Sequence, residues 1–297
     1  MLGTGGVRQN PGVRARRIAL CTWSDPSYVD PEPPLIARTL SERGHQADVQ
    51  VWHDGEVDWS GYDLVVIRST WDYFGRLEEF LSWVDGVASV TRIVNPPSVI
   101  RWNSHKGYLA ELGDHGIPVL PSLALPRRTV GAVDQLLAAG WDDVVIKPAV
   151  DGGARLALRT RATAPEAADH LCRLVDEGDV IVQPFAPSVT LGETSLFFFG
   201  ADFSHAVRKV PKAGDYRVQG HHGGSEQAHQ PTGGELEVAH AAMALAPAPL
   251  AYARADFIDV DGQPTLMELE LIEPDLFLRM DSRAVGRFAD LVESELD

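Results

Sequence analysis

The strongest chemical signal in the sequence is a set of three acidic residues near its C-terminal end. Asp256 lies on one expected strand, and Glu268 and Glu270 lie two positions apart on the next strand, so both point to the same face. A turn at 259–262 joins the two strands as a hairpin. Three carboxylates on one partly apolar face repel one another unless a cation lies between them. Such oxygen donors suit Mg²⁺ bound together with substrate phosphates, whereas a solvated edge face with harmless acids is the alternative interpretation.

Basic residues far apart in the sequence could meet an anion at the same place. Arg254 lies two positions before Asp256, shares its face and could contact a phosphoryl group. Lys147 ends an apolar strand, where an ordinary solvent-exposed surface lysine is not expected. The loop that follows, 151–154, reads Asp-Gly-Gly-Ala and could direct backbone N–H groups toward an anion. Two adjacent glycines more often form a plain turn, and the loop matches neither a Walker A nor a GxGxxG sequence.

Two further stretches could bind a ligand, but each also has a purely structural interpretation. The strand at 180–183 ends at Pro184 and Phe185, where free backbone groups could pair with an adenine edge, but an ordinary connection between lobes explains the same residues. A polar, glycine-rich loop at 211–234 is either a mobile lid or disordered, and Arg217 within it could clamp a substrate carboxylate. Its spacing matches no zinc motif, so we interpret its histidines as incidental: His221, His222 and His229.

The elements that must position these residues alternate between strand and helix. Residues 16–95 predict a small α/β unit with a parallel sheet. Residues 96–185 predict a compact sheet with helices, beginning with one helix over 103–114, and residues 186–297 predict a strand-rich lobe closed by an amphipathic helix. Residues 1–15 resemble a disordered tail and not a signal peptide. The strands that we expect are 17–22, 47–51, 63–68, 92–94, 119–125, 144–147, 155–159, 180–183, 194–199, 205–209, 250–258 and 265–271.

Composition narrows the class of partner. The chain has 297 residues, with 26 Lys and Arg against 42 Asp and Glu, which gives a net charge of −16. This balance argues against binding to nucleic acid or anionic membranes, because both need clustered positive charge. No stretch approaches the ~18 apolar residues of a membrane span. Cys21 and Cys172 fit no CxxC spacing, which favours free thiols in the cytoplasm.

The order of these features resembles the ATP-grasp superfamily, in the branch shared by D-alanine–D-alanine ligase and glutathione synthetase. The resemblance covers about residues 96–280 and implies an ATP-grasp fold, in which central and C-terminal lobes clasp the nucleotide beside an N-terminal parallel α/β lobe. One departure is Glu270, where many members have Asn; Glu can still bind a metal but adds a negative charge. The motifs that carry the resemblance are Asn103–Lys106, Gly116–Val119, Val145–Pro148, Asp151–Gly153, Val182–Phe185, Gly192–Glu193, Lys209, Arg254–Asp256 and Glu268–Glu270.

The resemblance implies a role for individual residues. Two lysines would contact the nucleotide phosphates, the glycine loop would cover them, and later residues would bind adenine and ribose. The implied ATP-binding residues are Lys106, Lys147, Asp151, Gly152, Gly153, Gln183, Pro184, Phe185 and Glu193. The residues expected to act on the transferring phosphoryl group and the substrate are Arg254, Lys209 and Arg217. Two Mg²⁺ ions, for which Mn²⁺ could substitute, would be held by Asp256, Glu268 and Glu270.

Three stretches, 68–73, 195–209 and 267–274, are similar to the actinobacterial group that contains the D-cycloserine-forming O-ureido-D-serine cyclo-ligase. This resemblance implies an antibiotic-biosynthesis ligase that activates an amino-acid carboxylate as an acyl phosphate for attack by an internal nitrogen. Loops at the carboxyl ends of strands bind ligands in open α/β sheets, although Trp71 and Tyr73 could simply be packed aromatics. The residues expected at the amino-acid end are Arg68, Thr70, Trp71, Asp72 and Tyr73.

Two other functions remain open at this point. An intermolecular peptide ligase of the glutathione synthetase type would need a second amine substrate. A non-catalytic ATP-binding regulatory module is a different class, and the presence of all three acids and of Arg254 counts against it. An NAD-dependent oxidoreductase is disfavoured because no glycine fingerprint follows the first strand. We expect ATP and a small amino-acid-like molecule as ligands, no nucleic-acid or membrane partner, and a chain that could form a homodimer.

Overall fold

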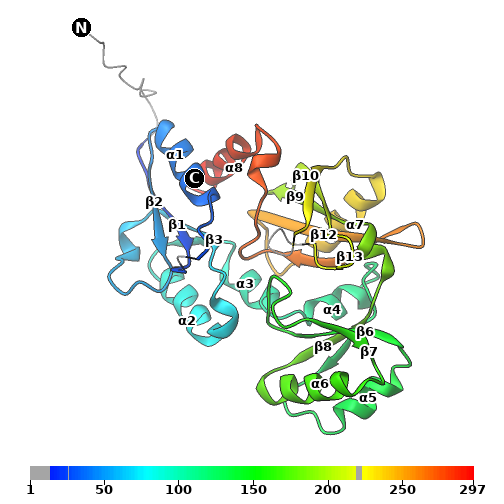
Figure 1. Ribbon diagram of the computed structural model, residues 1–297. Helices are drawn as coiled ribbons and strands as arrows, with labels where there is room; N and C mark the ends of the chain where they lie inside the picture. Colours follow the sequence, from blue (N-terminus) through cyan, green and yellow to red (C-terminus); the bar gives the residue numbers. More distant parts are fainter. Residues whose placement is uncertain (1–13, 26, 219–222) are drawn as a thin grey trace.

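The computed structural model describes residues 14–25, 27–218 and 223–297. Figure 1 shows three lobes that meet near the middle of the molecule. The N-terminal lobe holds a four-stranded parallel sheet in the order β2-β1-β3-β4, as the sequence predicts. Its helices are α1 (Glu32–Glu42) and α2 (Leu77–Ala88). Its strands are β1 (Arg17–Thr22), β2 (Gln46–Val51), β3 (Leu64–Ser69) and β4 (Arg92–Val94).

Both faces of this sheet are covered, which explains the continuous apolar run in β3. Leu64 and Val66 pack with α1 on one face, and Val65 and Ile67 pack with α2 on the other. The C-terminal helix α8 (Ala284–Ser294) also lies against the first face, beside α1 (Figure 1). The sequence assigns these last residues to the C-terminal lobe, but their apolar side chains join the core of the N-terminal lobe as well.

The central lobe contains an antiparallel sheet in the order β5-β8-β6-β7, covered by α5 (Ala132–Ala138) and α6 (Pro165–Glu177). Strand β7 begins later than expected because residues 151–157 form turns. The lower right of Figure 1 shows this lobe attached to the others along one edge. Its strands are β5 (Leu123–Leu125), β6 (Asp143–Pro148), β7 (Leu158–Arg161) and β8 (Val180–Pro184).

The single helix expected over 103–114 is wrong. Two short helices, α3 (Pro97–Asn103) and α4 (Tyr108–Asp114), replace it. At the break, the backbone N–H of Lys106 donates to the carbonyl of Ala149 at 2.8 Å, a partner just beyond the end of β6. This bond takes Lys106 out of the helical hydrogen-bond pattern and fixes it beside the central lobe. Helices α3 and α4 themselves pack on the C-terminal sheet.

The C-terminal lobe is built on a five-stranded antiparallel sheet in the order β11-β10-β9-β12-β13. Helix α7 (Gly233–Met243) begins at a capping box formed by Thr232 and Glu235, and it covers one sheet face together with α3 and α4. Strand β11 lies inside the stretch expected to be a loop, 211–234. The strands are β9 (Glu193–Phe199), β10 (Asp202–Val210), β11 (Ser225–Ala228), β12 (Tyr252–Val260) and β13 (Gln263–Glu270).

A buried amide is one of the links between the N- and C-terminal lobes. The Asn95 side chain donates to the carbonyls of Tyr252 and Leu271 at 2.9 and 2.7 Å, and it accepts from the Ala251 N–H at 2.6 Å. Cys21 is buried and Cys172 is exposed, and both are free. Among the described residues, no helix is long and apolar enough to cross a membrane.

Candidate active site

One face of the C-terminal sheet carries a row of charged side chains that stand directly opposite one another on adjacent strands. Asp256 on β12 faces Glu268 on β13, and Arg254 faces Glu270. On the other side, Asp256 faces Ser195 on β9. Because side chains alternate along a strand, the intervening apolar residues point to the opposite face and pack under α4 and α7. The predicted placement of the three acids on one face is confirmed.

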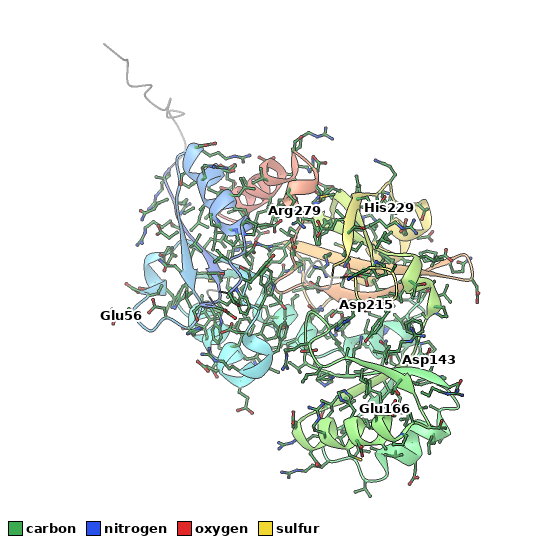
Figure 2. The ribbon with its side chains drawn as sticks, in the orientation of Figure 1. Glu56, Asp143, Glu166, Asp215, His229 and Arg279 are labelled. Atoms are coloured by element: carbon green, nitrogen blue, oxygen red, sulfur yellow. The ribbon has the colours of Figure 1, made fainter. Side chains whose placement is uncertain are left out.

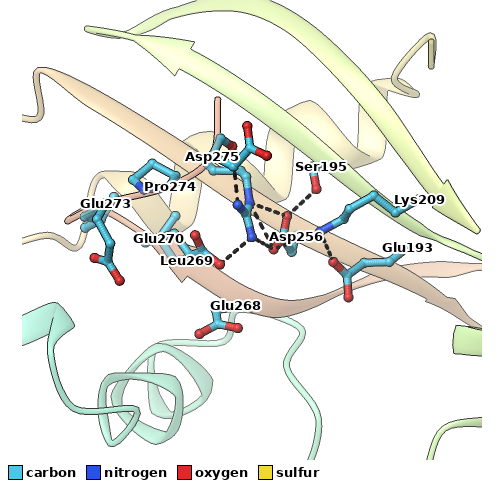
Figure 3. Close-up of polar contacts among 12 residues, drawn as sticks. Glu193, Ser195, Lys209, Asp256, Glu268, Leu269, Glu270, Glu273, Pro274 and Asp275 are labelled. Atoms are coloured by element: carbon cyan, nitrogen blue, oxygen red, sulfur yellow. Dashed lines mark hydrogen bonds and ion pairs between the residues drawn. The ribbon is translucent and has the colours of Figure 1, made fainter. Parts of the chain in front are cut away.

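Asp256 is the best-buried member of this row. It accepts hydrogen bonds from the Ser195 hydroxyl and from Arg254, whose Nη2 lies 2.8 Å away, and Lys209 Nζ lies 3.5 Å away (Figure 3). Burial opposes its ionisation, but the Arg254 guanidinium and the Lys209 ammonium outweigh it and hold the pKa of Asp256 well below its usual range. The carboxylate is therefore charged throughout the physiological range.

The neighbouring acids are also paired with cations from several elements. Glu270 accepts from Arg254, Glu268 accepts from Lys106 at the break between α3 and α4, and Glu193 at the start of β9 pairs with Lys209. Burial, offset in part by Arg254, raises the pKa of Glu270 to about 7. The row thus brings together residues from three separate parts of the chain, as the sequence analysis expected of a phosphate site.

Lys147 differs from the other lysines of the site. It is partly buried at the end of β6, and no acid lies within ion-pair distance of it in the described part of the chain. Burial and the charge of Lys106 lower the pKa of Lys147 to about 8. An ammonium that lacks a partner and is desolvated gains most from an incoming anion. Its position fits the phosphate contact that we expect of it.

The glycine loop after β6 is held in a defined conformation. Asp151 accepts from Arg155 Nε at 3.1 Å and from the Leu156 N–H at 3.4 Å. Gly153 has a φ of 64°, a left-handed conformation that glycine adopts without strain. A Cβ added to Gly152 would lie 2.2 Å from the Phe74 ring of the N-terminal lobe. The loop therefore packs directly on that lobe, at a position that only a glycine fits.

The residues expected to bind adenine lie at the edge of the central lobe. Gln183 is buried and donates to the Ser122 hydroxyl at 2.9 Å. Pro184 ends β8, and the Phe185 N–H after it donates to the Asp143 carbonyl at 2.8 Å. That N–H is thus already paired within the sheet. The Phe185 ring contacts the Arg159 guanidinium and packs edge-on to Tyr216.

Two residues expected at the amino-acid end hold a loop of the C-terminal lobe. Arg68 is fully buried and donates to the Pro274 carbonyl at 2.7 Å, with Glu32 3.6 Å away. Trp71 donates through Nε1 to the Glu273 carbonyl at 2.9 Å. Both side chains therefore touch the backbone that follows β13. The sequence could not reveal these partners, because they lie more than 200 positions away.

The other three residues of this stretch are mostly enclosed. Thr70 is buried, and its hydroxyl has no hydrogen-bond partner in the described part of the chain. Asp72 accepts from Trp52 Nε1 at 2.7 Å. Tyr73 is buried and stacked on Phe80. The packed-aromatic interpretation thus describes Tyr73, whereas Trp71 remains partly exposed beside the C-terminal lobe.

The basic and histidine side chains of the 211–234 segment make local contacts. Arg217 pairs with Asp215 at 2.8 Å and is not brought to the acidic row. His229 pairs with Glu235 at the start of α7, at 3.1 Å. Figure 2 shows that Asp215 and His229 lie well apart on the C-terminal lobe. His221 and His222 lie outside the described residues.

Sequence reasoning missed two polar residues of the site. Ser195 lies two positions after Glu193, so the period-two alternation of a strand was a signal that it shares the face. Glu273 follows the Glu-x-Glu motif by three positions, just past the end of β13. Its position in a loop gave no periodic signal. Figure 3 shows its carboxylate turned away from Asp256, on the side of Glu268 and Glu270.

The acidic row offers three carboxylates as candidate ligands of a divalent cation. As they stand, no three His, Cys, Asp or Glu side chains in the described ranges are arranged to hold a metal ion. Each acid of the row is paired with Arg254, Lys106 or Lys209. The chemistry nevertheless fits Mg²⁺, because three carboxylates on paired strands supply only hard oxygen donors.

Known proteins are similar to this chain in sequence and in fold. Residues 18–95 match the family model "D-cycloserine synthetase DcsG, N-terminal domain", and residues 125–280 match "Prokaryotic glutathione synthetase, ATP-grasp domain". The cycloserine biosynthesis protein DcsG of Streptomyces lavendulae is 35% identical over 299 residues, which cover 94% of this chain and 98% of that protein. Glutathione synthetase of Parasynechococcus marenigrum is 32% identical over 164 residues, about half of each chain.

Solved structures agree with these matches. The crystal structure of D-cycloserine synthetase DcsG superposes with a TM-score of 0.83 at 33% identity, over 95% of this chain and all of that one. D-alanine–D-alanine ligase of Bacillus anthracis complexed with ATP gives a TM-score of 0.66 at 14% identity, over 95% of this chain and 97% of that one, which shows the shared fold alone. The chain therefore belongs to the ATP-grasp family, in the group that contains D-cycloserine synthetase, and it is an ATP-dependent ligase.

Proposed function

We propose that this ligase activates the carboxylate of a small amino-acid-like substrate and closes a ring by attack of a nitrogen of the same molecule. The observation that carries the proposal is the single face on which Arg254, Asp256, Glu268 and Glu270 meet Lys106 from another segment. The similarity to DcsG over 94% of the chain supports the intramolecular form of the reaction.

The residues of this face divide the work of phosphoryl transfer among them. Lys106 and Lys147 neutralise the nucleotide phosphates from two sides, and the glycine loop at 151–154 covers them. Arg254 reaches the transferring γ-phosphoryl group as the substrate carboxylate attacks it. Positioning and neutralisation of spread charge supply most of the rate in such reactions. The nitrogen then displaces phosphate from the acyl phosphate, so no covalent bond to the protein is required.

The acidic row has a second proposed role as the site of two Mg²⁺ ions. Asp256, Glu268 and Glu270 would exchange their arginine and lysine partners for the cations when nucleotide binds. Bound Mg²⁺ would neutralise charge on the phosphates. Mn²⁺ should substitute, since it takes the same oxygen ligands. We expect Gln183, Pro184, Phe185 and Glu193 to bind the nucleoside part, and Arg217 to approach the substrate only if its segment moves.

Product analysis tests the proposal. The protein is incubated with ATP, Mg²⁺ and a panel of amino acids that includes O-ureido-D-serine, and the products are identified by mass spectrometry. Ring closure predicts a cyclic product, ADP and phosphate with one acid alone. A requirement for a second amine would establish the intermolecular peptide ligase instead. Tight ATP binding without ADP release across the panel would indicate the regulatory module.

The metal assignment has a separate test. Glu268→Gln should abolish turnover and leave the circular dichroism spectrum unchanged, because Gln keeps the size of the side chain but loses its charge. Turnover like that of the unmodified protein would refute the assignment. A cytoplasmic location and a homodimer are further proposals, to be tested by fractionation of the producing cell and by light scattering of the purified protein.

A further inference from the structure

The segment just after β13 is fixed by the N-terminal lobe through its backbone and not through its side chains. Trp71 Nε1 donates to the Glu273 carbonyl at 2.9 Å, and Arg68 donates to the Pro274 carbonyl at 2.7 Å. Both donors belong to the stretch at the carboxyl end of β3, an edge where parallel sheets commonly present ligand-binding loops. The backbone from which the Glu273 side chain projects is therefore held by two buried or partly buried donors.

The Glu273 side chain itself is left without a counter-charge. Every other carboxylate on this side of the sheet pairs with a cation: Asp256 and Glu270 with Arg254, Glu268 with Lys106, and Glu193 with Lys209. In the described part of the chain, the Glu273 carboxylate forms no ion pair and no hydrogen bond with another residue. Figure 3 shows its carboxylate facing away from Asp256, set apart from the carboxylates of Glu270 and Glu268 on the same side of the picture.

The surroundings of this carboxylate disfavour a negative charge that stays unpaired. Burial, then the charges of Glu270 and Glu268, raise the pKa of Glu273 to about 8, although Lys106 works in the opposite direction. The same carboxylate contributes to the raised pKa of the buried Tyr73 hydroxyl, after burial itself. A partly desolvated carboxylate among like charges is stabilised most by a cation delivered with the ligand.

The position of Glu273 favours a substrate ammonium group over a metal ion as its cation. It lies past the end of β13, outside the row of facing residues that contains the three expected metal ligands, and toward the partly exposed Trp71. A substrate carboxylate that reaches the phosphoryl group near Arg254 would have its α-carbon a short distance away. An ammonium group on that carbon would then face Glu273 from the direction of the N-terminal lobe.

We propose that the Glu273 carboxylate binds the ammonium group of the amino-acid substrate, and that Trp71 and Arg68 are positioning residues that hold its backbone. The proposal rests on the proposed function, because it needs an amino acid whose carboxylate is activated at Arg254. It also changes the role expected of Arg68 and Trp71. Arg68 and Trp71 do not contact the substrate themselves; they act on it indirectly, by holding the loop that follows β13.

The test compares Glu273→Gln with the unmodified protein on two matched molecules. One is O-ureido-D-serine, and the other is its des-amino analogue, which keeps the carboxylate and the ureidooxy group but lacks the ammonium. Loss of a charged hydrogen bond predicts that Glu273→Gln raises the KM for O-ureido-D-serine about 10- to 100-fold. The KM for ATP and the KM for the des-amino analogue should stay nearly unchanged. Glu56→Gln, on the exposed surface, is the matched control.

Folding and metal roles are separated by further measurements. Glu273→Asp keeps the charge and should recover part of the affinity, and the melting temperature of each variant reports on folding. Trp71→Phe removes the donor to the Glu273 carbonyl, so it should raise the KM for O-ureido-D-serine by about threefold to tenfold with little change for the des-amino analogue. An equal loss on both molecules, or a large rise in the KM for ATP and in the Mg²⁺ requirement, would overturn the proposal.

Binding distinguishes failure of the subsite from failure of the proposed function. If the unmodified protein does not turn over O-ureido-D-serine, calorimetry is carried out with a non-hydrolysable ATP analogue, Mg²⁺ and each α-amino acid of the panel beside its des-amino acid. Preference for an ammonium-bearing ligand that Glu273→Gln abolishes would support the subsite and reject the substrate proposed above. No preference, or a preference that survives Glu273→Gln, would overturn the subsite.

Discussion

Two buried arginines, one in each of two lobes, show how differently the same side chain is used. Arg254 on β12 pairs with the buried Asp256 and with the partly exposed Glu270. Arg68 at the end of β3 donates to a backbone carbonyl, and its nearest acid, Glu32, also accepts from the N–H groups of Leu276 and Leu278. The first arrangement lies within one sheet and includes an acid that solvent reaches, whereas the second joins two lobes.

Exposure decides which arrangement can meet a ligand. The side chains of Glu268 and Glu270 are 29% and 27% exposed, whereas those of Arg68 and Glu32 are 0% and 4% exposed. The carboxylates of Glu268 and Glu270 are therefore accessible from solvent, whereas Arg68 and Glu32 are not. From the sequence, Arg68 and Arg254 are both strand arginines near candidate site residues, so only the location of their partners separates a catalytic role from an architectural one.

Arg254→Met has the largest expected effect on activity. Loss of one preorganised charge at a transferring phosphoryl group costs about 10²- to 10³-fold in turnover. Stability should change less, because Asp256 keeps its contacts with Ser195 and Lys209. Steady-state kinetics and a thermal melt on the same sample measure both quantities. Near-normal turnover of this variant would show that Arg254 has no catalytic role, and that Arg254 and Arg68 do not differ in function.

Arg68→Met should show the opposite profile. Removing one partner of a buried charge cluster costs about 3 kcal/mol, because Glu32 loses its counter-charge and the Pro274 carbonyl loses its donor. For a chain of this size that lowers the melting temperature by roughly 5–10 °C. Turnover with saturating substrates should survive below the transition. A variant that melts normally but has lost turnover would show that Arg68 acts at the site directly.

Gly152→Ala tests the contact between the two regions. The new Cβ would lie 2.2 Å from the Phe74 ring, so the glycine loop must move away from the nucleotide phosphates. Overpacking of about 1–2 kcal/mol predicts a rise in the KM for ATP of about tenfold. Adding Phe74→Leu makes room for the methyl group and should reverse most of that rise. If the second substitution brings no recovery, the loop is not positioned by the N-terminal lobe.

The smallest expected effect is a pH dependence of nucleotide binding through Lys147. Because burial lowers its pKa to about 8, the charged form is disfavoured, so the contribution of this group to stability falls as the pH drops from the usual lysine range through 8. Phosphates favour the charged form. ATP affinity should therefore decrease about threefold as the pH rises from 7.5 to 8.5. Calorimetry measures this decrease, and Lys147→Met should remove it.

Local sequence patterns predicted which acidic residues share a strand face, but not the long-range contacts that surround them. Glu268 and Glu270 share a face because a strand repeats every two residues, and that period can be read from sequence. The pairing of Asp256 with Glu268 depends on a register shift next to Asp256, which no local pattern encodes. The break that frees Lys106 depends on a hydrogen bond to Ala149, on another element. Long-range contacts of this kind determine which side chains face the ligand.

The ion pairs of the acidic row have a consequence for which form of the nucleotide the protein accepts. Carboxylates occupy the places beside Arg254, Lys106 and Lys209 that phosphate oxygens would take. These carboxylates thus neutralise the same basic side chains that the phosphates of a bound nucleotide would neutralise. Metal-free ATP would have to displace these carboxylates from their cations and leave them unpaired in a region already rich in negative charge. A nucleotide that binds together with divalent cations gives each displaced carboxylate a new partner. We therefore expect the site to discriminate strongly against metal-free ATP.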